Sequence, residues 1–338
     1  MVGCAPPVGG AHETTRFHYV ARKRGGLAAC GAGTSAGDLP RVAILSPGPA
    51  TADRVPIFLG RLRELGYVDG RNIRLDIRFA ENRLDRLPAL AAELVKARPA
   101  VIYTSSTPGA FAAAGATTSI PIVVGPASEQ TMEQLAGNLA KPVANVTGFA
   151  VGVESQEEKC LDLLKQAAPD LSRIGVLLNP DNRIWHDTPI GLKVATEQLG
   201  SVLIRVESRG AVDIDRTLSH YTNGTVDGLL LVDDSTLAGD SSVRARVIEF
   251  AREHHLPSVS SYSTYARDGG LLSLGTDMGS IFRSAAEYVH RIIHGARPSE
   301  LPVQRPTKFE LVINLKTAKA LGLTIPPSIL ARADEVIE

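Results

Sequence analysis

The sequence predicts an α/β protein made of two doubly wound, parallel-sheet lobes that are joined by a hinge of several chain crossings. Three observations lead to this class. Short apolar strands alternate with amphipathic helices from residue 41 onward, the same alternation begins again at residue 173, and 338 residues suffice for two hydrophobic cores. Strands separated by helices pair in parallel through right-handed crossovers, so each series is expected to form an open sheet with helices on both faces.

The first series opens with a buried apolar strand at residues 42–45. The helix that follows, at 52–65, places Val55, Phe58 and Leu62 on one face, and Gly66 ends it. The later elements are expected at 72–79 (strand), 84–94 (helix), 101–103 (strand), 109–116 (helix) and 120–124 (strand).

The second series opens with an apolar strand at residues 173–178. Its other strands are expected at 202–206, 228–232, 257–260 and 271–274, with helices near 187–199, 212–221 and 241–254. An extended stretch at 145–150 and an amphipathic helix at 153–168 connect the two series. The last third then runs from a strand through a helix at 280–294 and a proline-stiffened passage to a strand at 309–314. This order predicts a crossing between two lobes that share one hinge.

Composition excludes several classes of protein. Lys and Arg together number 36, as do Asp and Glu, and aromatic residues make up 5% of the chain. A nucleic-acid binder would show a basic excess or stripe and stacking aromatics, so we expect no nucleic-acid partner. No apolar run is long enough to span a bilayer. The three cysteines, Cys4, Cys30 and Cys160, are odd in number and far apart, so no disulfide framework is expected.

Residues 1–40 do not have the pattern of a folded domain. They are rich in Gly and Ala, and the run that ends at Cys30 matches the small-residue pattern at which lipoprotein signals are cut. An export signal needs an apolar region between its basic residues and its cleavage site. No such region lies between the basic residues 22–24 and Cys30. We therefore expect residues 1–40 to be a poorly ordered segment that contains a degraded export signal. A misassigned start of the sequence and lipidation at Cys30 are the alternatives.

Polar residues follow the strands at the edge where open parallel sheets bind ligands. Four of them, Thr104, Ser105, Ser106 and Thr107, come directly after a predicted strand and precede a predicted helix. Hydroxyls and free N–H groups at a helix start form a cradle for an anion, such as an organic carboxylate. Plain N-capping of the helix is the alternative, and the two roles are compatible.

Acidic residues follow two strands of the second series. Asp233 and Asp234 end a predicted strand, where one of them could accept hydrogen bonds from a ligand ammonium group. Asp277 lies where the chain would leave the second lobe, and it is a further candidate ligand contact. Capping of the following loop or helix is the alternative for Asp233 and Asp234, and a hinge or capping role is the alternative for Asp277.

Aromatic residues and one serine complete the candidate site. Trp185, the one tryptophan, follows a predicted strand end, so it would form an aromatic wall at the cleft rim or pack against its own helix. Tyr262 is a similar candidate, and Ser46 follows the first strand. Glu287, His290 and His294 share one helix face, but no ligand from a second element accompanies them, so we expect no metal site.

Four segments resemble a known protein family. They are residues 65–72 (LGYVDGRN), 145–148 (NVTG), 173–177 (RIGVL) and the tail 301–338. With these segments, residues 41–338 resemble the extracytoplasmic substrate-binding proteins of a bacterial ABC-transporter family, some of which are linked to tryptophan or tyrosine uptake. The resemblance implies a periplasmic-binding-protein type I fold, capture of a small solute, and a membrane permease as partner.

The resemblance also implies how the chain is divided. The helix near 279–295 would return to the first lobe, and the strand near 309–314 would return to the second. The first lobe is then expected to comprise residues 41–148 and about 277–300, and the second lobe residues 149–276 and about 301–338.

The predicted function is that of a solute receptor and not of an enzyme. The sequence has no P-loop, no H-E-x-x-H motif and no paired-cysteine metal spacing, and we expect no cofactor. The receptor would bind an amino acid or related carboxylate by hinge closure, act as a monomer and lie in the periplasm or outside the cytoplasm. A hydrolase or isomerase using Asp233 or Asp277 as a base is the alternative. A ligand-sensing regulator would need a helix-turn-helix before residue 41, and none is present.

Overall fold

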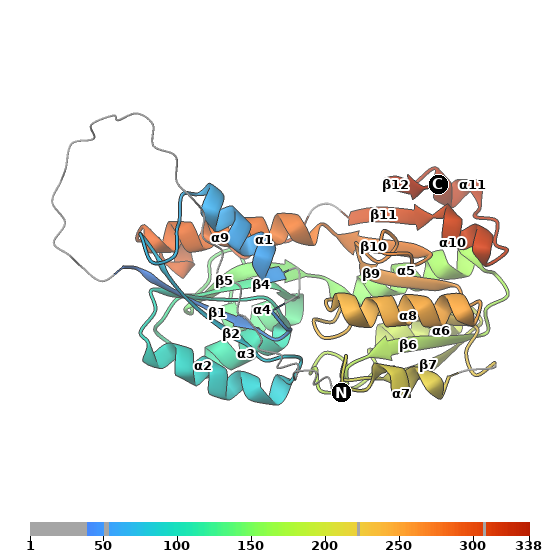
Figure 1. Cartoon of the computed structure of the whole chain (residues 1–338), viewed down its shortest axis with the longest axis horizontal. Coiled ribbons are helices and arrows are strands. Elements are labelled where there is room, and N and C mark those ends of the chain that lie inside the picture. Colours follow the sequence, from blue (N-terminus) through green and yellow to red (C-terminus); the bar gives the residue numbers. More distant parts are fainter. Residues whose placement is uncertain (1–38, 51–53, 222–223, 307–308) are drawn as a thin grey trace, which may run out of the picture. The chain divides into compact units, whose positions relative to one another are not determined.

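The computed structural model describes residues 39–50, 54–221, 224–306 and 309–338 (Figure 1). The predictions for residues 1–38, including lipidation of Cys30, lie outside this part of the chain. Residues Leu39–Glu338 form one compact unit that contains two sheets. The prediction of an α/β fold with two sheets is therefore confirmed.

The first sheet is wholly parallel and has the order β2-β1-β3-β4-β5. Its strands are β1 (Arg41–Ser46), β2 (Arg74–Phe79), β3 (Val101–Thr104), β4 (Ile122–Ser128) and β5 (Val146–Val151). The central strands are buried on both faces, which explains their nearly continuous Val and Ile content. The 3₁₀ turn η1 (Leu84–Arg86) and four helices connect the strands: α1 (Arg54–Glu64), α2 (Leu87–Lys96), α3 (Thr107–Ala116) and α4 (Glu129–Ala136).

Helices cover both faces of this sheet. On one face α1 packs beside α9 (Met278–Ile293), which comes from near the end of the chain (Figure 1). The rings of Phe58 and Tyr103 stack in this layer with centroids 3.8 Å apart. On the other face, α2 and α3 bury Leu87, Ile102 and Ala110 in a separate cluster. The carboxyl end of β3 is therefore packed between helices on both faces of the sheet.

The second sheet has the order β12-β11-β10-β9-β8-β6-β7. Its strands are β6 (Arg173–Leu178), β7 (Val202–Glu207), β8 (Gly228–Leu231), β9 (Ser258–Tyr262), β10 (Leu272–Thr276), β11 (Phe309–Asn314) and β12 (Glu335–Ile337). Its helices are α5 (Val153–Ala167), α6 (Ile190–Gln198), α7 (Ile214–Ser219), α8 (Ser241–Glu253), α10 (Leu315–Ala320) and α11 (Pro327–Leu330). The core between them is built from Leu, Ile and Val of β6, β8 and α5.

The second sheet is parallel from β7 to β10, and its last two strands run in the opposite direction. β11 runs antiparallel to β10, while β12 runs parallel to β11. The chain leaves β10 at Thr276, forms α9 beside the first sheet, and re-enters the second sheet at the same end. Because β11 enters where β10 leaves, the two neighbours run in opposite directions.

Three crossings connect the sheets, at residues 151–153, 276–278 and 304–309. Before the last crossing, and after the 3₁₀ turn η2 (Pro298–Glu300), the chain runs alongside β5. Ala150 N donates to Gln304 O at 2.8 Å, and Gln304 N donates to Gly148 O at 2.9 Å. The predicted lobe boundaries at residues 148 and 300 stay predictions. In the structure, residues 149–151 belong to β5 of the first sheet, and the hydrogen bonds of Gln304 attach residues 301–304 to that strand.

Candidate functional site

A small polar cavity lies between the carboxyl ends of strands from both sheets. Its volume is about 30 Å³, which is room for a water molecule or two. The polar side chains that line it are Arg54, Ser106, Thr107 and Ser128 on the first-sheet side, and Asn182, Asp233 and Ser235 on the second-sheet side. This cavity is where the topology predicts a ligand site for open parallel sheets.

Arg54, the first residue of α1, connects the two sides of the cavity. Its side chain is 5% exposed, its Nη1 donates to Ser105 O at 3.4 Å, and its Nη2 lies 3.5 Å from Asp233 Oδ1. Nε and Nη2 have no hydrogen-bond acceptor among the described residues. A Cβ at Gly239 would lie 2.4 Å from Nη2, so a glycine at that position makes room for the guanidinium. A buried cation with unmet donors favours an oxyanion ligand.

Asp233 provides the negative charge on the opposite side. It follows β8, and its backbone N–H donates to Glu157 Oε1 at 3.1 Å and to Ser261 Oγ at 2.9 Å, which fixes its position. Burial raises the pKa of the Asp233 carboxyl, and the charge of Arg54 works in the opposite direction. A carboxylate in this setting is stabilised by a cationic ligand group.

Glu157 on α5 lies beneath Asp233, away from the cavity lining. Ser261 Oγ donates to its Oε1 at 2.5 Å, while Oε2 has no partner among the described residues. Burial raises the pKa of Glu157 to about 8. The carboxyl is therefore mostly protonated at neutral pH.

Hydroxyl groups surround the start of α3. Ser106 Oγ caps the helix by accepting from Gly109 N at 3.1 Å, and Thr107 Oγ1 accepts from Ser128 N at 3.1 Å. The hydroxyls of Tyr103, Thr104 and Ser105 are buried and have no partner among the described residues. The predicted capping role of this segment is present, and unmet donors remain beside it.

The structure separates the residues predicted from the sequence into two groups. Ser106, Thr107 and Asp233 line the cavity. The others do not line it: Ser46, Thr104, Ser105, Trp185, Asp234, Tyr262 and Asp277. Ser105 still contributes through its carbonyl oxygen, which Arg54 contacts.

Two of the predicted acids have structural roles instead. Asp234 accepts from Asn182 Nδ2 at 2.6 Å and from Thr236 N at 2.7 Å, so its carboxylate is occupied in shaping the loop. Asp277 is exposed and caps α9 by accepting from Ser280 N at 3.0 Å. In both cases the geometry matches the capping alternative.

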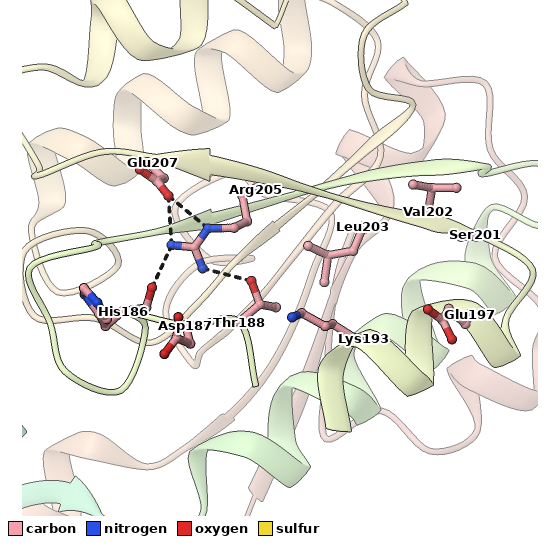
Figure 2. A pocket seen from close by; sticks show the side chains of 10 residues that line it. All are labelled: His186, Asp187, Thr188, Lys193, Glu197, Ser201, Val202, Leu203, Arg205 and Glu207. Atoms are coloured by element: carbon pink, nitrogen blue, oxygen red, sulfur yellow. Dashed lines mark hydrogen bonds and ion pairs between the residues drawn. The ribbon is translucent and has the colours of Figure 1, made fainter. Parts of the chain in front are cut away.

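The expectation of a tryptophan at the cleft rim is corrected. Trp185 is fully buried in the core of the second sheet, because its large apolar ring packs there while Asn182 and Ile184 face the cavity. Arg205 fixes this loop by donating to Trp185 O at 3.3 Å and to Thr188 Oγ1 at 2.9 Å. Figure 2 shows Arg205 in a separate surface cavity of about 540 Å³, where it also contacts Glu207.

Tyr262 is buried beside the cavity and not in it. The guanidinium carbon of Arg54 lies 5.7 Å from the ring centroid, and that of Arg244 lies 4.9 Å from it. Both distances are within the range of a cation–π contact. The ring therefore supports Arg54 from the second-sheet side.

Arg54, Ser128, Asn182 and Ser235 line the cavity but are not among the site residues predicted from the sequence. A signal existed for Arg54, because a basic residue in the first turn of a helix opposes the helix dipole and needs a compensating reason. Asn182 gave no comparable signal, since asparagine is common in loops. Among the described residues, no group of three or more His, Cys, Asp or Glu side chains could hold a metal ion.

Comparison with known proteins gives a consistent result. Residues 41–337 match the family model for ABC transporter substrate binding proteins. The tyrosine-binding protein of Clostridioides difficile strain R20291 is 26% identical over 273 residues, which are 79% of this chain and 75% of that protein. The described residues include no helix that is long and apolar enough to cross a membrane.

Solved structures agree with the family match. A conserved domain protein of Vibrio cholerae O1 biovar El Tor is 27% identical, with a TM-score of 0.78 over 88% of this chain and 100% of that one. A Streptococcus pneumonia ABC domain in complex with L-Trp is 23% identical, with a TM-score of 0.76 over 89% of this chain and 100% of that one. The fold of these chains is shared along nearly their whole length.

Proposed function

Because the chain belongs to the family of ABC transporter substrate binding proteins, we propose that it captures an amino acid between its lobes and delivers it to a membrane permease. The observation that carries this proposal is the buried pair of Arg54 and Asp233, which face one cavity from opposite sheets. In this reading the protein works outside the cytoplasm, as its family does.

The charges match a zwitterion. Arg54 Nη2 and Asp233 Oδ1 are 3.5 Å apart, which is too long for a strong hydrogen bond. An α-amino acid placed between them would replace this one long contact by two short ones. Arg54 would donate to the carboxylate of the amino acid, and the ammonium group of the amino acid would donate to Asp233. Charge-assisted bonds of this kind are the stronger class of hydrogen bond.

The size of the cavity supports binding by closure. A volume of about 30 Å³ does not admit an amino acid, so the lobes must separate for entry. A solute that bonds to Arg54 in one lobe and Asp233 in the other gains both sets of contacts only when the lobes close. Such a solute shifts the equilibrium toward the closed form.

The relatives favour an aromatic amino acid. One is a tyrosine-binding protein, and another was solved with L-Trp. The comparisons do not support the alternative hypothesis of an α/β enzyme, because the matched family consists of substrate-binding proteins.

Calorimetric titration with the common amino acids tests the proposal. We expect binding of L-tyrosine or L-tryptophan, and roughly a 30-fold or greater loss of affinity in R54Q, because a buried charge loses its partner. R63Q is the matched control, since Arg63 lies on the same helix and is exposed. If no amino acid binds, or if R54Q binds as the wild type does, the proposal is wrong.

A further inference from the structure

A second contact joins the lobes at a place outside the cavity. Asn82 follows β2, and its Nδ2 donates to Oδ2 of Asp240 at 2.7 Å. Both residues are buried, at 8% and 4% exposure, and neither lines the cavity. The bond therefore holds first-lobe and second-lobe residues together without touching the place of the solute.

The acceptor of this bond is held rigidly by its own lobe. Asp240 caps α8, where its Oδ1 accepts from Ser242 N at 2.9 Å and from Ser242 Oγ at 2.7 Å. Its other oxygen, Oδ2, is left for Asn82. One carboxylate thus fixes the start of a helix and offers a defined acceptor to the opposite lobe.

The donor is held in an unusual backbone conformation. Glu81 and Asn82 have φ values of 55° and 62°, in the left-handed region that residues other than glycine seldom adopt. Asn82 N donates to Pro47 O at 2.9 Å, which ties this turn to the loop after β1. Asparagine tolerates such a conformation, while glutamate is strained in it.

We propose that Asn82 and Asp240 form a clasp that stabilises the closed arrangement before any solute is bound. They would act as positioning residues that set solute affinity without contacting the solute. When only a fraction of the protein is competent to bind, the apparent dissociation constant rises in inverse proportion to that fraction. Loss of the clasp therefore weakens binding through the closed population. The predicted effect of the clasp on solute affinity rests on the function proposed above.

Exchanging the two groups provides the test. N82D places two carboxylates face to face and should open the lobes, whereas N82D/D240N lets Asn at 240 donate to Asp at 82 and should close them again. Asparagine is also an accepted helix cap, so the start of α8 is kept. N82G removes the amide and suits the left-handed backbone, and E81G is the control that changes the same turn without touching the clasp.

Small-angle X-ray scattering without solute gives the direct readout. We expect larger radii of gyration for N82D and N82G, and wild-type values for E81G and N82D/D240N. A calorimetric titration with L-tyrosine should show about a 10-fold loss of affinity in N82D that the double variant recovers, which corresponds to about 1.4 kcal/mol. Melting temperatures identify any variant that does not fold.

Two results would overturn the clasp. One is wild-type scattering for both N82D and N82G, and the other is a folded double variant that is as open as N82D. If no amino acid binds to any of these proteins, wild type included, the proposed function fails. The scattering comparison still decides the clasp in that case, because it uses no solute.

Discussion

At the scale of single residues, the role proposed for Asp233 is to recognise the amino group of the solute. We expect D233N to bind L-tyrosine roughly 30-fold more weakly or worse, because a neutral amide cannot balance the ammonium charge. The analogue of tyrosine that lacks the amino group, 3-(4-hydroxyphenyl)propanoate, should bind to D233N and to the wild type with similar affinity. Calorimetry on both ligands checks this. An equal loss for the two ligands would show that Asp233 does not recognise the amine.

Glu157 makes stability depend on pH. Its pKa is about 8 in the folded protein, while a glutamate in an unfolded chain titrates near about 4.3. The folded state binds the proton more tightly, so the stabilisation is complete below about pH 4.3 and is lost as the pH rises toward 8.

The variant E157Q keeps a neutral hydrogen-bonding group at all pH values. We expect its melting temperature to fall less between pH 5 and 8 than that of the wild type, and to be a few degrees higher at pH 8. E158Q is the control, since Glu158 is half-buried on the same helix. Parallel melting curves against pH for wild type and E157Q would rule out titration of Glu157 in this range.

The candidate site was only partly predictable at this scale. Ser106, Thr107 and Asp233 follow strands, so the rule for open parallel sheets selected them, and all three line the cavity. The same rule cannot say which way a side chain points, so it also selected Trp185, which packs in the core. Arg54 was missed because its partner Asp233 lies far along the sequence and comes from the other sheet.

At the scale of elements, β7 is an edge strand, and two of its carbonyl groups accept hydrogen bonds from side chains. Tyr221 OH donates to Arg205 O at 3.0 Å, and Thr217 Oγ1 donates to Glu207 O at 3.1 Å. An exposed strand edge is a template for pairing with a second chain, and these hydroxyls reduce that risk. The arrangement supports the prediction of a monomer, which no comparison tests.

Removing both hydroxyls should expose the edge of β7. We expect the double variant T217V/Y221F to dimerise at high protein concentration while the wild type stays monomeric, as sedimentation velocity would show. S219A is the control, because the Ser219 hydroxyl bonds within α7, to Arg216 O. A monomeric double variant would mean that something other than these hydroxyls protects the strand.

Most elements could be predicted because their apolar periodicity is strong. The strands at 41–46, 101–104 and 173–178 are short apolar runs, and the sequence placed each within a residue or so. The helices α4, α10 and α11 and the strand β12 were not predicted, since they have 8, 6, 4 and 3 residues and are too short to establish a period. The antiparallel direction of β11 depends on where α9 lies, which no local pattern encodes.

At the scale of the whole molecule, neither lobe is one continuous stretch of chain. The face of the first sheet that carries Tyr103 is covered by α9, which buries Ile281, Phe282 and Val289. Burying a large apolar side chain contributes about 1.5–3 kcal/mol. The large apolar residues of α9 together contribute roughly 10 kcal/mol, which is comparable to the net stability of a domain.

A fragment that ends at residue 276 should therefore not fold. We expect residues 39–276 to show no cooperative thermal transition by circular dichroism, because the first sheet lacks α9 and the second sheet lacks β11. The full chain serves as the control. A sharp melting transition in the fragment would show that the lobes do not depend on the C-terminal segment.

The late position of α9 also orders events during synthesis. A growing chain makes all the strands of the first sheet early, yet the helix that covers one face of that sheet emerges from the ribosome only near the end. Until then α1 is the helix that covers this face, so we expect the first lobe to reach its final packing only late in synthesis. A polypeptide that has to pass through a translocation channel before it folds benefits from that delay.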